Sequence, residues 1–126
     1  GAWIAYVTDE SGVREVYVQA FPERRGRWQV SEGGSCPIWS RDGRELFYVD
    51  GNTIRAVSIS TQPSFSSGPP RTVAELDFLP SSESLVNYDV APDGRLLLVR
   101  GTSRSSYEGH VNVVLGWGAG LRRADQ

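Results

Sequence analysis

The chain has 126 residues and a mass of 13.8 kDa, with 39% hydrophobic and 22% charged residues. This composition is typical of a soluble folded domain and is neither that of a disordered chain nor that of a membrane protein. No apolar run approaches the roughly 20 residues of a transmembrane helix. Residues 1–7 lack the charged and apolar regions of a signal peptide, so the sequence predicts neither feature and leaves the compartment undetermined.

The charged and metal-binding residues exclude several kinds of site. A net charge of -2 and a pI of about 5.4 argue against nucleic acid or an anionic membrane as a partner. The single cysteine, Cys36, excludes an intrachain disulfide, and the single histidine, His110, excludes a histidine-rich metal site. All 13 basic residues are arginine, which excludes lysine-based chemistry. The sequence therefore implies no cofactor and no metal ion.

Short segments rich in β-branched, leucine and aromatic residues recur along the chain, each bounded by turn residues. Because no long segment has helical periodicity, they predict an all-β fold. In chain order the predicted strands are Trp3–Val7, Glu15–Ala20, Arg27–Ser31, Cys36–Ser40, Glu45–Val49, Thr53–Ile59, Arg71–Leu76, Val86–Ala91, Arg95–Arg100 and Val111–Trp117. Leu121–Gln126 is compatible with a short turn of helix, and Ser60–Pro70 is predicted to be a long connection.

The pattern within individual strands indicates how they are buried. Glu45–Val49 and Arg95–Val99 are almost continuously apolar, as expected of strands packed on both faces. Arg27–Ser31 alternates between apolar and polar residues, which predicts one solvent-facing side. Inner and outer strands of stacked sheets would show this difference.

One strand-turn-strand unit is repeated. When Asp42-Gly43 is placed on Asp93-Gly94, Pro37–Val49 aligns with Tyr88–Val99, and residues 1–7 align with residues 43–49. The aspartate is expected to accept a local backbone N–H, and the glycine supplies the positive φ that such turns require. The repeat predicts a sandwich, barrel or propeller, and the alignment implies that the sequence opens inside one such turn.

The segment Pro37-Ile-Trp-Ser-Arg-Asp-Gly-Arg-Glu-Leu-Phe-Tyr48 resembles the repeat of TolB-type, WD-like β-propellers. The order of segments over residues 1–117 resembles the C-terminal propeller region of certain bacterial Ser/Thr protein kinases. The resemblance implies four-stranded antiparallel blades, with blade 1 at about 1–35, blade 2 at 36–85, blade 3 at 86–117 and a tail at 118–126. Blade 1 would lack its innermost strand and blade 3 its outermost. Kinase motifs are absent, which excludes phosphoryl transfer.

A partial propeller of about three blades is expected to complete itself with other chains. The smallest ring of such blades needs about 160 residues, more than this chain has. We therefore expect homo-oligomerisation, with a homodimer favoured and a trimer as the alternative. Trp3, Trp39, Phe47 and Tyr48 are predicted to pack between blades.

The implied strand order gathers several chemically capable residues on one face, around the mouth of the channel. Cys36, His110 and Asp9 would supply a thiol nucleophile, a base and an orienting carboxylate. Candidate ligand-binding residues in the same loops are Glu10, Arg104, Tyr107 and Glu108. Arg24, Arg25 and Arg27 are predicted to form a solvated patch on the opposite face.

Three functions remain open. The first is a non-catalytic propeller module that binds a small ligand or a protein. The second is a small hydrolase of carboxylic or phosphate esters centred on Cys36 and His110, and the third is a propeller fragment without a function of its own. A simpler interpretation makes Cys36 a small buried apolar residue and Asp9 a turn residue. Because no recognisable catalytic motif occurs in the sequence, the binding module is favoured.

Overall fold

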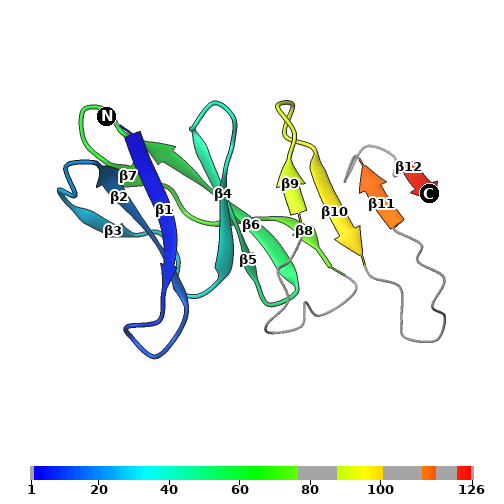
Figure 1. Ribbon diagram of the computed structural model, residues 1–126, viewed down its shortest axis with the longest axis horizontal. Coiled ribbons are helices and arrows are strands. Elements are labelled where there is room, and N and C mark those ends of the chain that lie inside the picture. The colour runs from blue at the N-terminus through cyan, green and yellow to red at the C-terminus, as the bar shows by residue number, and fades with distance from the viewer. Residues whose placement is uncertain (1, 77–87, 101–111, 116–121, 126) are drawn as a thin grey trace.

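The computed structural model describes residues 2–76, 88–100, 112–115 and 122–125, and the side chains of residues 2–76 and 88–98. These residues form three antiparallel sheets and no helix, which confirms the predicted all-β fold. Figure 1 shows the first, second and third sheets following one another across the molecule in chain order. The described strands do not close into a barrel.

The first sheet has three strands, in the spatial order β1 (Ala2–Thr8), β2 (Glu15–Phe21) and β3 (Arg27–Gln29). Tyr6 lies opposite Tyr17, which in turn lies opposite Gln29. β3 ends at Gln29 and not at the predicted Ser31, because the Val16 N–H pairs with a side chain there instead of a backbone carbonyl. The hydroxyl of buried Ser31 accepts a hydrogen bond from the Val16 backbone N–H at 2.9 Å.

The second sheet comes from the middle of the chain and lies between the first and third sheets (Figure 1). Its strands are β4 (Ser35–Trp39), β5 (Glu45–Asp50), β6 (Thr53–Ser60), β7 (Ser66–Ser67) and β8 (Arg71–Glu75). β6 pairs with β5 along one edge, while its other edge is divided between β8 at the start and β7 at the end. β7 falls in the segment predicted to be a connection, so that connection is partly tied to the sheet.

The third sheet corrects two expectations. Its strands, in spatial order, are β12 (Arg122–Asp125), β11 (Asn112–Leu115), β10 (Leu96–Arg100) and β9 (Tyr88–Val90). The helical turn predicted for Leu121–Gln126 is wrong, because β12 pairs antiparallel with β11. A segment this short gains little from helix formation, whereas the open edge of β11 offers it backbone hydrogen bonds. The third sheet thus has four strands and extends into the segment assigned to a tail, so the expectation that it lacks an outermost strand is also wrong.

The two Asp-Gly turns have the same structure, as the repeat predicts. Gly43 and Gly94 have φ values of +71° and +84°, and each donates its N–H to the carbonyl three residues earlier at 2.9 Å. The carboxylates of Asp42 and Asp93 each accept the backbone N–H two residues further on, at 3.0 and 3.1 Å. The repeat therefore holds at the level of single hydrogen bonds.

Directly after the turn, the second copy of the repeat loses one residue. The Ser40 N–H donates to the carbonyl of Glu45 at 2.9 Å, whereas the Ala91 N–H donates to that of Arg95 at 2.7 Å, one position nearer the turn. β10 is thus shifted by one residue relative to β5. Because side chains alternate between the faces of a strand, this shift exchanges the faces on which they lie.

The hydrophobic core consists of two clusters, one on each side of the second sheet. The first cluster, shared with the first sheet, comprises Val16, Val18, Val30, Leu46, Tyr48, Val57 and Ile59, with Trp3, Ala5, Val7, Trp39 and Phe65 packed against it. The second cluster, shared with the third sheet, comprises Phe47, Val49, Ile54, Ala56, Ala74, Leu76, Tyr88, Leu96 and Leu98, with Cys36, Ile38, Val73 and Val90 packed against it. These members confirm that Glu45–Val49 packs on both faces and that the four predicted aromatic residues lie between sheets.

Packing on both faces is not seen for β10 within the described residues. Leu96 and Leu98 are 2% and 5% exposed and face the second sheet. Leu97, between them on the opposite face, is half-buried and belongs to neither cluster. The third sheet therefore presents an apolar side chain on its outer face.

An aromatic group that the sequence analysis missed ties the first sheet to the long connection of the second. Phe65 stacks on Trp28 with ring centroids 4.7 Å apart, and both rings contact Trp3, at 5.4 and 5.5 Å. Aromatic pairs at these separations are favourable beyond the area that they bury. The connection is thus folded against the first sheet rather than extended.

Candidate functional site

Cys36, the predicted nucleophile, lies at an irregularity of β4. The pairing with β5 shifts between Ser35 and Ile38, so that two residues of β4 face one residue of β5. Cys36 itself has a φ of +54°, in the left-handed region where a side chain costs free energy. A bulge of this kind usually carries glycine at that position. The strained backbone is therefore part of the bulge.

The neighbours of Cys36 are apolar and structural. Its side chain is half-buried and packs against the second cluster. Its carbonyl accepts a hydrogen bond from the hydroxyl of Tyr88 at 2.6 Å, which links the second sheet to the third. Among the described residues, no group of three or more His, Cys, Asp and Glu side chains could hold a metal ion. These contacts favour the interpretation of Cys36 as a packing residue.

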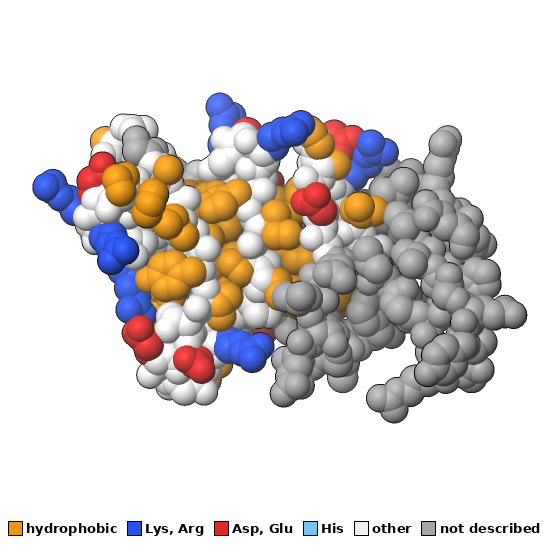
Figure 2. All heavy atoms as spheres, viewed as in Figure 1, with side chains coloured by type: hydrophobic (Ala, Val, Ile, Leu, Met, Phe, Trp, Pro, Cys, Tyr) orange, Lys and Arg blue, Asp and Glu red, His pale blue; other side chains and the backbone are white. Residues whose placement is uncertain are grey.

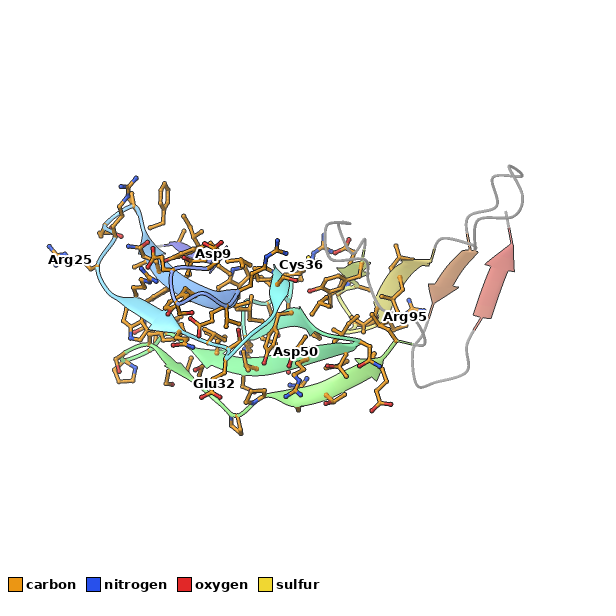
Figure 3. All side chains as sticks on the ribbon, turned by 90° about the horizontal axis from the view of Figure 1, so that it is seen from below. Asp9, Arg25, Glu32, Cys36, Asp50 and Arg95 are labelled. Atoms are coloured by element: carbon orange, nitrogen blue, oxygen red, sulfur yellow. The ribbon has the colours of Figure 1, made fainter. Side chains whose placement is uncertain are left out.

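Asp9 and Glu10 lie in the turn between β1 and β2. The carbonyl of Asp9 accepts the Gly12 N–H at 2.8 Å, and Gly12 has a φ of +89° that the turn requires. Asp9 is exposed, and Figure 3 places it with Cys36 along the same side of the molecule. His110 lies outside the described residues, as do Arg104, Tyr107 and Glu108. The Cys36–His110–Asp9 site therefore stays a prediction.

Glu10 has a partner that the sequence analysis placed on the opposite face. Its carboxylate lies 2.8 Å from a guanidinium nitrogen of Arg27, and this hydrogen bond raises the pKa of Arg27. The guanidinium also lies over the ring of Tyr17, 4.1 Å from its centroid. Arg27 begins β3, and its long side chain reaches the β1–β2 turn. The prediction of a separate solvated patch is thus wrong for Arg27.

A polar groove lies between the first and second sheets. It has a volume of about 630 Å³ and is lined by Gln29, Val30, Ser31, Glu32, Gly33, Tyr48, Asp50, Arg55 and Pro70. In it the Arg55 Nε lies 3.2 Å from the Asp50 carboxylate. This nitrogen is buried from solvent and has no hydrogen bond of good geometry to any described residue. Burial raises the pKa of the Tyr48 phenol, which stays protonated at neutral pH. The groove therefore offers polar groups to a small polar molecule, but it contains both an acidic and a basic side chain and favours neither an anion nor a cation.

The outer face of the first sheet exposes large apolar side chains. Strand alternation places Ile4, Tyr6, Tyr17, Gln19, Phe21, Arg27 and Gln29 on it. Ile4 is 42% exposed and Phe21 is 45% exposed, while Tyr6 and Tyr17 stack with ring centroids 6.1 Å apart. Figure 2 shows a band of apolar side chains over β1, β4 and β9, which are edge strands of the three sheets, so this band is not confined to the outer face of the first sheet. Tyrosine, phenylalanine and arginine are enriched in protein–protein interfaces.

The first predicted strand carries a sequence signal for this face. Trp3–Val7 is apolar at consecutive positions, which is also the pattern of a strand packed on both sides. The structure covers one side of β1 only, because the first sheet has a single neighbour among the described sheets. The described residues therefore leave the outer face of β1, with the exposed Ile4, without a covering sheet.

None of the described segments is a helix long and apolar enough to cross a membrane. No protein-family model matches the chain, and no curated protein is significantly similar to it.

Proposed function

We propose that the chain is a non-catalytic, protein-binding module of the β-propeller type, and that its partner is a second copy of itself. The three sheets would be successive blades of an open arc. Three features support the proposal: the hydrogen-bonded Asp-Gly turn that recurs in the second and third sheets, the row of face-to-face sheets, and the two separate inter-sheet cores.

The observation that carries the proposal is the exposed apolar outer face of the first sheet. Two large apolar side chains there, Ile4 and Phe21, are each more than two-fifths exposed. Exposed large apolar side chains beside polar ones are typical of a protein interaction site. Here Gln19 lies between Ile4 and Arg27 across the sheet, and the Glu10–Arg27 ion pair at 2.8 Å lies on the β3 side. A binding function accounts for the surface that the fold leaves uncovered.

Self-association can be tested by size-exclusion chromatography with light scattering, over protein concentrations from low to high micromolar. We expect the mass to rise from that of one 13.8-kDa chain towards twice that value. A mass of one chain at every concentration would refute self-association. A mass of three chains would replace the dimer by a trimer.

A further inference from the structure

We infer that the outer face of the first sheet binds the outer face of the third sheet of a second copy, so that two copies pair head to tail. This inference rests on the proposed self-association and adds to it the two surfaces that meet. The contact would continue between chains the face-to-face packing that already joins the sheets within one chain.

Equivalent positions in the second sheet show which contact the side chains on the outer face of the first sheet would make. By the repeat, Ile4 and Tyr6 of β1 correspond to Leu46 and Tyr48 of β5. In the second sheet, Leu46 and Tyr48 are 0% and 2% exposed, because they face the preceding sheet. Ile4 is 42% exposed at the corresponding position. The first sheet thus carries the side chains that contact a preceding sheet, but the described residues provide no such sheet.

The third sheet shows the complementary situation. After the one-residue loss, Leu96 corresponds to Leu46 and faces the preceding sheet, as expected. Leu97 then corresponds to Phe47, which is 2% exposed because it contacts the succeeding sheet. Leu97 is half-buried and belongs to neither cluster, and Asp89, opposite it on β9, is exposed. The third sheet therefore carries the side chain that contacts a succeeding sheet, without one among the described residues.

Among the described residues, the first sheet has no preceding sheet and the third sheet has no succeeding one, so each could supply what the other lacks. In a head-to-tail pair the first sheet of one copy would receive the third sheet of its partner as its preceding sheet. A two-fold axis would make the same contact twice, which closes the pair and leaves neither outer face open. A second copy is therefore the one occupant that satisfies both faces at once.

The test compares three glutamate substitutions in the dilution series described above. Ile4→Glu and Leu97→Glu each place a charge on one of the two proposed surfaces. Val13→Glu is the matched control, because Val13 is 58% exposed in the β1–β2 turn and belongs to no strand of either face. An unpaired charge in a buried contact should raise the dissociation constant by on the order of 100-fold for both test variants. The control should associate like the unmodified chain.

Folding is checked by circular dichroism and tryptophan fluorescence of each variant. If a glutamate variant does not fold, Ile4→Thr and Leu97→Thr replace it, since threonine keeps the strand preference and removes apolar surface. A dimer that persists in either Ile4→Glu or Leu97→Glu would overturn the head-to-tail arrangement while leaving self-association intact. An unmodified chain that stays monomeric would instead refute the proposed function itself.

Discussion

Tyr88 forms a hydrogen bond whose removal tests how the second and third sheets are joined. Its ring is 7% exposed within the second cluster, and its hydroxyl donates to the carbonyl of Cys36 at 2.6 Å. Tyr88→Phe removes the donor and leaves the ring in place. A typical hydrogen bond contributes about 1 kcal/mol, and a buried acceptor that is left unpaired costs about 1–3 kcal/mol. Because Cys36 is only half-buried, water can partly replace the lost donor. We expect the free energy of unfolding to fall by about 1.5 kcal/mol.

The assay is urea unfolding followed by tryptophan fluorescence, on protein diluted until it is a single species. The midpoint should fall at constant slope, with a decrease in melting temperature of roughly 5 °C. Tyr48→Phe is the matched control, since its ring is 2% exposed but its side chain lines the open groove. The control should change by less than about 0.5 kcal/mol. Equal effects of the two substitutions would refute the idea that the Tyr88 hydroxyl ties the sheets together.

Three further predictions concern the turns and Cys36. Gly34→Ala should destabilise by about 2 kcal/mol or more in the same unfolding assay, because its Cβ would lie 2.7 Å from the Tyr48 ring at a φ of +102°. Gly12→Ala, at a φ of +89° but in open space, should cost only about 1 kcal/mol, and equal costs would contradict the close approach. The pKa of Asp42 is lowered, first by the hydrogen bond from the Ser40 hydroxyl. The stabilising effect of the Asp42 carboxylate is therefore present above the ordinary pKa of 3.8 and is lost as the pH falls below that value. Asp42→Asn should flatten this dependence of the urea midpoint on acid pH, and an unchanged dependence would refute this role of Asp42. Cys36→Ala should leave any hydrolysis of carboxylic or phosphate esters unchanged, and a loss of activity in the folded variant would restore the hydrolase hypothesis.

The all-β fold could be predicted because its signals are local. The alternation of apolar residues in Glu15–Ala20 agrees with one packed face, and the continuous apolar run at Glu45–Val49 agrees with two. Asp42-Gly43 likewise specifies its turn through its own side chain and its positive φ. Such features need no knowledge of distant residues.

Features that depend on contacts between distant segments were not predictable in the same way. β12 forms from Arg122–Asp125, which has little intrinsic strand preference, because β11 offers it an edge. The left-handed backbone of Cys36 follows from the bulge in β4, and no cysteine pattern indicates it. The Glu10–Arg27 pair depends on the reach of one long side chain along the sheet. In each case the sequence shows one partner without showing the other.

The candidate site differs from the expected one for a similar reason. The sequence analysis chose its candidate catalytic residues by their chemistry and so named Cys36, whose neighbours in the structure are apolar, as the simpler interpretation of a buried packing residue expects. The outer face of the first sheet contains no reactive group, and it becomes visible only when Ile4 is compared with the buried Leu46. A repeat therefore indicates an interaction surface through the positions where equivalent residues differ in burial.

Mixing two of the glutamate variants tests head-to-tail pairing most directly. Alone, Ile4→Glu and Leu97→Glu each damage both contacts of the pair. In a mixed pair both charges fall in the same contact, and the other contact joins two unmodified surfaces. An equimolar mixture should therefore recover species of twice the 13.8-kDa chain mass, with weaker association than the unmodified protein but stronger than either variant alone. A mixture that stays at the mass of one chain, while the unmodified protein dimerises, would contradict this arrangement.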